Sequence, residues 1–243
     1  LTRDAEGAYV FTDGLSDRID LEKAFLALKQ IVENGQETLN LQESGCYYEI
    51  TPDESQKTLR NLWKEIERFQ TCDIVYCFGE ERHPVTAADC ASFLTAQNGL
   101  PVQDEKGSFV LDEEAVTAYV QSLAEEYDGY GRTRQFHSTC GDVITIEGGT
   151  YGSKMDRKKE TAYLLEHLLD PGVHTGTPQT HIPIYEREAF CYGKNDIGDT
   201  YIEVDMTEQK MYYYEKGVLK LETEIVTGNM RRRMGTPEGV NFV

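Results

Sequence analysis

The chain has 243 residues, of which 39% are hydrophobic, and its formal net charge at pH 7 is −19. This length holds one large or two modest domains with packed cores, and the mean hydropathy of −0.53 argues against a membrane span. The negative charge would repel nucleic-acid phosphates and anionic lipid surfaces, so we expect no nucleic acid partner and no peripheral membrane binding.

The first predicted helix begins after Asp20, whose short acidic side chain is a suitable N-cap. The apolar residues that follow at helical spacing are Leu21, Phe25, Leu28 and Val32. The pair Asn34-Gly35 ends the helix, because these residues tolerate the left-handed backbone of a C-terminus.

A second helix is predicted from the regular spacing of Leu59, Leu62, Trp63, Ile66 and Phe69. Burial of the Trp63 and Phe69 side chains would contribute roughly 2–3 kcal/mol each. We therefore expect this helix to carry the core of the first domain. The apolar run 74–78 follows it as a strand.

Two further helices are marked by their N-caps. Thr86 with Asp89 has the pattern of a capping box, and Asp112 precedes an apolar stripe. The stripe consists of Val116, Tyr119, Val120, Leu123 and Tyr127. Together these helices and short strands predict an α+β domain over residues 20–130.

Residues 131–197 are predicted to be a structured connector, with a strand at 143–146 and a helix that begins near Asp156. The connector's order of signals is a glycine turn, an aspartate, leucines and a glycine stop. The same order occurs from Gly7 through Asp20 to Gly35. An internal repeat is therefore one interpretation, in which residues 1–19 are the tail of a preceding repeat or a linker.

Residues 198–243 alternate between apolar and polar side chains, as half-buried strands do. The apolar members of this alternation are Ile202, Val204, Met206, Leu219, Leu221 and Ile225. The sequence stops in an apolar run at Val243. Because apolar strand edges invite pairing, we interpret this segment as the incomplete first part of a mostly β domain.

A family resemblance is carried by residues distributed between 195 and 240. They are Asn195-Asp196-Ile197-Gly198-Asp199-Thr200-Tyr201-Ile202-Glu203-Val204-Asp205, Gln209, Tyr213-Tyr214, Gly217, Thr227-Gly228-Asn229 and Thr236-Pro237-Glu238-Gly239-Val240. This stretch resembles the start of a bacterial L,D-transpeptidase catalytic domain. Residues 20–130 resemble the peptidoglycan-binding domain that precedes it in many Gram-positive enzymes.

The resemblance implies an enzyme that cross-links peptidoglycan stem peptides by acyl transfer through a cysteine thiolate. In that family a histidine and a later Ser-His-Gly-Cys run supply the activated thiol. No His-Gly pair occurs in this sequence. We therefore expect the catalytic His and Cys to lie beyond Val243 and residues 1–243 to contain no catalytic residue.

The resemblance also implies where the protein works and what it meets. It implies an extracellular, cell-wall-associated protein in a Gram-positive cell envelope, with peptidoglycan as the partner and no cofactor. A membrane contact is expected only through an N-terminal anchor outside this sequence.

His137-Ser138-Thr139-Cys140 is the segment that brings a histidine, hydroxyls and a cysteine together. Its residue order is wrong for the family's nucleophile, so surface or turn residues are the better interpretation. A metal site at His137 and Cys140, or at His174 and His181, lacks a second ligand pair with suitable spacing. We therefore expect no metal.

Arg231, Arg232 and Arg233 form the densest positive run and lie in a predicted hairpin loop. An arginine fork binds a carboxylate bidentately, so these residues are candidates for binding stem-peptide carboxylates. A solvated turn is the alternative interpretation. Tyr212-Tyr213-Tyr214 could stack on sugar rings, but packing within a sheet is the simpler expectation.

Two other classes of protein stay open at this point. One is a cell-wall binding or scaffold module without catalytic activity, and the other is an unrelated extracellular adhesin. The sequence beyond Val243 separates the enzyme from the module, and binding to purified peptidoglycan separates both of them from the adhesin.

Overall fold

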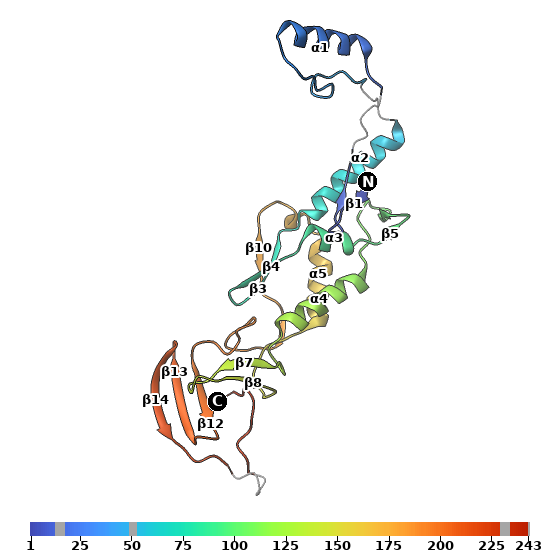
Figure 1. The fold of residues 1–243 in the computed structure, drawn as a ribbon. Helices are drawn as coiled ribbons and strands as arrows, with labels where there is room; N and C mark the ends of the chain where they lie inside the picture. Colours follow the sequence, from blue (N-terminus) through green and yellow to red (C-terminus); the bar gives the residue numbers. More distant parts are fainter. Residues whose placement is uncertain (13–17, 49–52, 229–233, 243) are drawn as a thin grey trace.

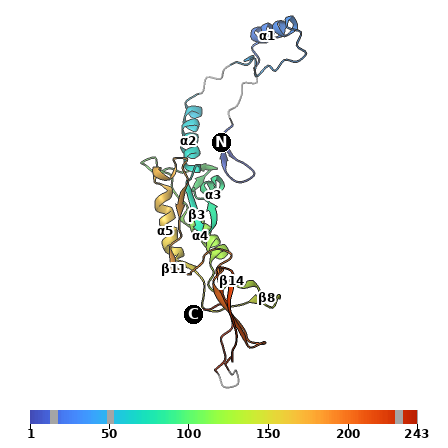
Figure 2. The same ribbon diagram turned by 90° about the vertical axis from the view of Figure 1, so that its left-hand side faces the viewer.

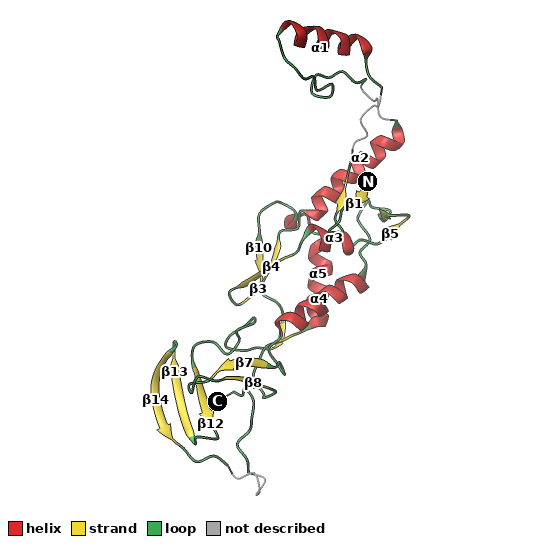
Figure 3. Ribbon diagram, in the orientation of Figure 1, coloured by secondary structure: helices red, strands yellow, loops and turns green. Residues whose placement is uncertain are grey.

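The computed structural model describes residues 1–12, 18–48, 53–228 and 234–242, which form an elongated molecule with three parts (Figure 1). A lobe built on helix α1 lies at one end, a body of helices and short strands lies in the middle, and a β-rich part lies at the other end. The view turned by 90° shows the same succession (Figure 2). Helices and small sheets alternate along the chain, which confirms the predicted α+β class (Figure 3).

The helices are α1 (Leu21–Glu33), α2 (Glu54–Gln70), α3 (Ala87–Ser92), α4 (Glu113–Tyr127), α5 (Arg157–Leu168) and the 3₁₀ helix η1 (Pro171–Val173). Four of the helices, α1, α3, α4 and α5, begin at the residues that the sequence predicts as their starts. Asp20, Asp112 and Asp156 accept backbone N–H groups in the first turns of α1, α4 and α5. The capping box at Thr86 is also confirmed. Each such cap stabilises its helix by about 0.5–2 kcal/mol.

The strands are short and form several small sheets. They are β1 (Thr2–Arg3), β2 (Tyr9–Val10), β3 (Ile74–Phe78), β4 (Glu81–Pro84), β5 (Ala96–Gln97), β6 (Leu100–Pro101), β7 (Arg134–His137), β8 (Val143–Ile146), β9 (Lys154–Met155), β10 (Gln179–His181), β11 (Tyr185–Arg187), β12 (Tyr201–Asp205), β13 (Lys210–Glu215) and β14 (Val218–Glu224). Among the described residues, two sheets have three strands, in the orders β10-β3-β4 and β12-β13-β14, and the others are two-stranded. Strand β10 runs parallel to β3, and the other pairs are antiparallel.

The hydrophobic core lies in the body, between β3, α4 and α5. Its fully buried side chains include Tyr76, Phe78, Phe93, Ile66, Ile74, Leu123, Leu164, Leu168 and Val116. The predicted stripe on α4 is confirmed, with Tyr119 partly buried at its margin. Helix α5 and strand β10 belong to the predicted connector 131–197, yet they share this core with residues of the predicted domain 20–130. The boundary near residue 130 stays a prediction.

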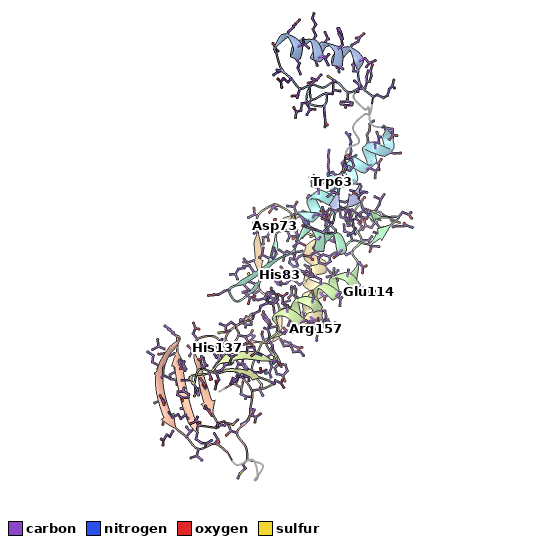
Figure 4. The ribbon with its side chains drawn as sticks, viewed as in Figure 1. Trp63, Asp73, His83, Glu114, His137 and Arg157 are labelled. Atoms are coloured by element: carbon purple, nitrogen blue, oxygen red, sulfur yellow. The ribbon has the colours of Figure 1, made fainter. Side chains whose placement is uncertain are left out.

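Helix α2 contributes to the core through its C-terminal half only. Phe69 is 4% exposed, and its ring meets the ring of Phe109 edge-on at a centroid distance of 5.4 Å. Trp63 is half-buried and stacks on Phe11 at 6.1 Å. The side-chain view places Trp63 near the upper limit of the body (Figure 4). The expectation that both aromatic residues are core residues is therefore correct for Phe69 and only partly correct for Trp63.

The β12-β13-β14 sheet has the predicted alternation of apolar and polar side chains. However, the face that packs against the rest of the protein is not the apolar face. Ile202, Val204 and Leu221 share one face and are 40%, 40% and 47% exposed. The other face carries Tyr201 and Glu203 and lies against the β7–β8 hairpin. The expectation of buried apolar residues on this sheet is therefore wrong for the described residues, because aromatic and hydrogen-bonding side chains make the contact instead.

Candidate functional site

The structure does not reach the predicted substrate-binding arginines. Arg231, Arg232 and Arg233 lie outside the described residues. Their role in binding carboxylates stays a prediction.

The His137 and Cys140 segment forms the turn of the β7–β8 hairpin, where the body meets the C-terminal sheet (Figure 4). The thiol of Cys140 is exposed and donates to a carboxylate oxygen of Asp205 at 3.7 Å. Thr139 donates its hydroxyl and its backbone N–H to Glu203, at 2.5 and 3.1 Å. The partner of Cys140 is thus an acid rather than an imidazole, and the turn attaches the hairpin to the sheet.

A buried acid–imidazole pair joins α5 to β10. The carboxylate of Glu160 is fully buried and accepts from His181 Nε2 and from the backbone N–H of Ile184, both at 2.7 Å. Tyr163 stacks on the His181 ring at 3.8 Å. Burial, followed by the charge of Glu160, raises the pKa of Tyr76 well above its ordinary value. These contacts lie inside the core, where they hold the helix to the strand.

A second buried pair lies where the body meets the β-rich part. The Arg134 guanidinium donates to both carboxylate oxygens of Asp196, at 2.8 and 2.6 Å. It also donates to the carbonyl oxygens of Gly129 and Arg132, at 2.5 and 2.9 Å. The two charged side chains are 4% and 1% exposed. Because every arm of the guanidinium has an acceptor, the pair fixes residues 129–134 against residue 196.

A tight backbone crossing supports this junction. Gly152 has φ of +128°, and a Cβ at this position would lie 2.2 Å from the carbonyl carbon of Gly129. Tyr151 donates its hydroxyl to the carbonyl oxygen of Asp196 at 2.8 Å. Residues 129–134 and 151–152 therefore pack together with the loop that contains Asp196.

A surface groove of about 270 Å³ lies at the turn of β3 and β4 and extends to β10. Its lining residues are Cys77, Gly79, Arg82, Thr180, Ile182 and Tyr192. The exposed side chain of Arg82 is held by donation from Nη1 to the carbonyl oxygens of Gly79 and Glu81, at 2.7 and 3.0 Å. Ile182 is 69% exposed beside it.

This groove combines a guanidinium, an aromatic ring and an apolar side chain. A guanidinium recognises a carboxylate, while the ring of Tyr192 and the side chain of Ile182 offer apolar contact to small alkyl groups. The groove has the chemistry to bind a small acidic peptide. Its residues come from three separate segments, so no local sequence signal could have predicted it.

Within residues 1–12, 18–48, 53–228 and 234–242, no group of three or more histidine, cysteine, aspartate or glutamate residues is arranged to hold a metal ion. In the same ranges no helix has both the length and the apolar character needed to cross a membrane.

Comparison with known proteins gives one family match and similar solved structures. Residues 93–172 match the family described as a putative peptidoglycan binding domain. The crystal structure of an Enterococcus faecium L,D-transpeptidase with a cysteine-to-serine mutation is 28% identical, with a TM-score of 0.57. The structure of the Ldtfm-avibactam carbamoyl enzyme is 29% identical, with a TM-score of 0.58. No curated protein matches the chain.

The resemblance to L,D-transpeptidases is confirmed. The similarity covers 74% of this L,D-transpeptidase-like chain, and it covers 66% and 65% of the two solved chains. The chain therefore spans slightly less than two thirds of the structures that it matches. The family match contains α4, the β7–β8 hairpin and α5, and it therefore extends across residue 130.

Proposed function

We propose that this chain is the wall-binding portion of an extracellular, cell-wall-associated L,D-transpeptidase, and that peptidoglycan is the ligand of its body. The observation that carries the proposal is the family match at residues 93–172, which includes the packed pair α4 and α5. The similarity to solved L,D-transpeptidases over 74% of the chain supports the same role.

The enzyme would transfer an acyl group between stem peptides through a cysteine thiolate. One of the similar solved structures is that of a cysteine-to-serine mutant, and the other is that of a carbamoyl enzyme. The sequence 1–243 contains no Ser-His-Gly-Cys run, and the exposed Cys140 contacts an acid. Within this proposal, residues 1–243 bind the wall and do not catalyse transfer by themselves.

The groove at Arg82 is our candidate for the wall-binding site. Stem peptides of peptidoglycan carry carboxylates and small alkyl side chains, and the groove offers a guanidinium beside Tyr192 and Ile182. The chain carries a net charge of −19, so an exposed arginine in a groove is a specific feature rather than part of a general basic surface.

Sedimentation with purified peptidoglycan tests both statements. We expect residues 1–243 to sediment with it and the variant Arg82→Glu to bind about tenfold more weakly, since a hydrogen bond to a charged group is worth about 1.5–3 kcal/mol. Lys106→Glu is the matched control, because it makes the same change of charge at an exposed residue outside the groove.

The outcomes separate the function from the site. If the wild-type protein stays in the supernatant at both low and high salt, wall binding is refuted. If it sediments and Arg82→Glu sediments equally well, wall binding stands and the groove is refuted as its site.

A further inference from the structure

Two cysteines of the body lie side by side at the corner where α2 passes into β3. Cys72 lies between the end of α2 and the start of β3, and Cys90 lies in α3. The Cys90 side chain is 0% exposed, and Cys72 is partly buried against the same hydrophobic core. Both thiols are free, and a side-chain hydrogen bond joins them. The fold therefore brings together two sulfur atoms from different elements.

The register of the β3–β4 hairpin explains this contact. The ladder pairs Ile74 with Val85, whose backbone N–H donates to the carbonyl oxygen of Ile74 at 3.0 Å. Continued by two residues, the same register places Cys72 opposite Ala87, the first residue of α3. Cys90 follows Ala87 by about one helical turn and so lies on the same face of the helix. A strand ladder and a capped helix thus hold the two thiols in contact.

The two thiols differ in acidity and in access. The hydrogen bond with Cys90 lowers the pKa of Cys72, against the opposing effect of burial. The same hydrogen bond, followed by burial, raises the pKa of Cys90 well above its ordinary value. The buried Cys90 therefore holds the proton, and Cys72, the thiol that solvent can reach, has the greater thiolate character.

The hydroxyl of Tyr119 is a further donor beside the pair. The ring of Tyr119, on α4, meets the ring of Phe93 edge-on at 5.2 Å, at the end of α3. Among the residues that the structure describes, this buried hydroxyl has no hydrogen-bond partner. Burial, followed by the charge of Asp89 and then by those of the two cysteines, raises the pKa of Tyr119, so the hydroxyl keeps its proton. A charge on either sulfur would therefore meet a donor rather than a second anion.

We propose that Cys72 and Cys90 form a thiol–disulfide site, which a small-molecule disulfide converts into a covalent link between the α2–β3 corner and α3. This inference goes beyond the proposed function, and its test does not use wall binding.

The exchange takes place in two steps that balance. The Cys72 thiolate attacks one sulfur of the small disulfide, which forms a mixed disulfide and releases the other sulfur as a thiolate. The mixed disulfide has no charge on Cys72, so the main cause of the high pKa of Cys90 is removed and Cys90 gives its proton to the released thiolate. The Cys90 thiolate then attacks the Cys72 sulfur, and the second small thiolate leaves and takes up the proton that Cys72 had given to solvent. The two cysteines are oxidised, and the small disulfide is reduced to two thiols.

The new bond would close the loop 72–90, which contains β3, β4 and thus Gly79 and Arg82 of the groove. Residues 71–72 lie outside the helices and strands, so they can adjust to the S–S distance of about 2.05 Å that a disulfide requires. A disulfide restricts the unfolded chain, so the oxidised protein should melt at a higher temperature.

Disulfide mapping on residues 1–243 tests the proposal. The protein is oxidised with oxidised glutathione at neutral pH, and its remaining thiols are alkylated. Trypsin then releases peptide 69–82, which contains Cys72, and peptide 83–106, which contains Cys90. We expect mass spectrometry without reduction to find these two peptides joined at a yield at least about tenfold above any other pair of cysteine peptides, because contact gives a high effective concentration. In urea this preference should be lost, since only the fold places the two thiols together.

Two matched variants assign the link, because peptide 69–82 also contains Cys77. Cys77→Ser should keep the joined peptides, and Cys72→Ser should lose them. Oxidation should raise the melting temperature of the wild type and of Cys77→Ser by about 6 °C or more, as expected for a loop of this length, and leave that of Cys72→Ser unchanged.

Three results would overturn the proposal. The first is oxidised wild-type protein that carries glutathione adducts but no joined peptides. The second is a link that persists in Cys72→Ser, which would assign it to Cys77. The third is an equal rise in melting temperature on oxidation of the wild type and of Cys72→Ser.

Discussion

Removal of Arg134 should destabilise the junction between the body and the β-rich part. The variant Arg134→Met keeps most of the side-chain volume but leaves the Asp196 carboxylate, which is 1% exposed, without its cation. It also removes the donors to the carbonyl oxygens of Gly129 and Arg132. Breaking a buried ion pair by removal of one partner costs about 3–5 kcal/mol, because the remaining charge is buried without compensation.

For a chain of this size, each kcal/mol lowers the melting temperature by roughly 2–4 °C, so we expect a decrease of roughly 6–20 °C in thermal unfolding. Lys154→Ala is the matched control. It breaks the pair of Lys154 with Glu186, whose side chains are 40% and 45% exposed, and should cost less than about 1 kcal/mol.

A double-mutant cycle separates the charge from the packing. Adding Asp196→Asn to Arg134→Met removes the uncompensated charge, so the double variant should be more stable than the sum of the single changes predicts, by at least about 1 kcal/mol. Additive costs, or a cost of Arg134→Met no larger than that of Lys154→Ala, would show that this pair does not hold the junction.

Two further predictions concern backbone and pH. Burial raises the pKa of Asp73, but hydrogen bonds from Thr175 and Gly176 outweigh it and hold this pKa below its ordinary value. The ionised Asp73 carboxylate therefore stabilises the fold above pH ~4, and this stabilisation is lost as the pH falls. Asp73→Asn should lower stability at neutral pH and flatten its decline in acid, measured as urea midpoints against pH; an unchanged acid decline would contradict it. Gly152→Ala should cost more than about 1–3 kcal/mol in urea unfolding, since it adds the clash with Gly129 to an unfavourable φ, and a cost below this would argue against the tight crossing.

Helix positions could be predicted from the sequence because their signals are local. Asp20, Asp112 and Asp156 cap helices within the next few residues, and the apolar spacing that follows marks the face of each helix. The strand at 74–78 could also be predicted from the sequence, because it is a short apolar run. The spacing of apolar residues does not predict whether another element covers that face. The sequences of α1 and α5 therefore have similar apolar spacing, although the two helices differ in burial.

The candidate groove and the junction could not be predicted, because their residues meet only in the folded chain. Arg134 and Asp196 are distant in sequence, and Arg82 lies in β4 whereas Tyr192 lies in a distant loop. The buried face of the last sheet was predicted wrongly for a related reason. Alternation identifies two faces, and the contact of Glu203 with a distant hairpin decides which one is covered.

The β7–β8 hairpin determines how the body is oriented relative to the last sheet. At its base Arg134 is fixed to Asp196, and at its turn Thr139 is fixed to Glu203 at the start of that sheet. Two attachments at opposite ends of one hairpin restrain rotation, whereas a single attachment would leave a hinge. A ligand held on the body would therefore lie at a defined position relative to the sheet. In the enzyme proposed above, such a restraint would replace part of the entropy that substrate positioning would otherwise cost.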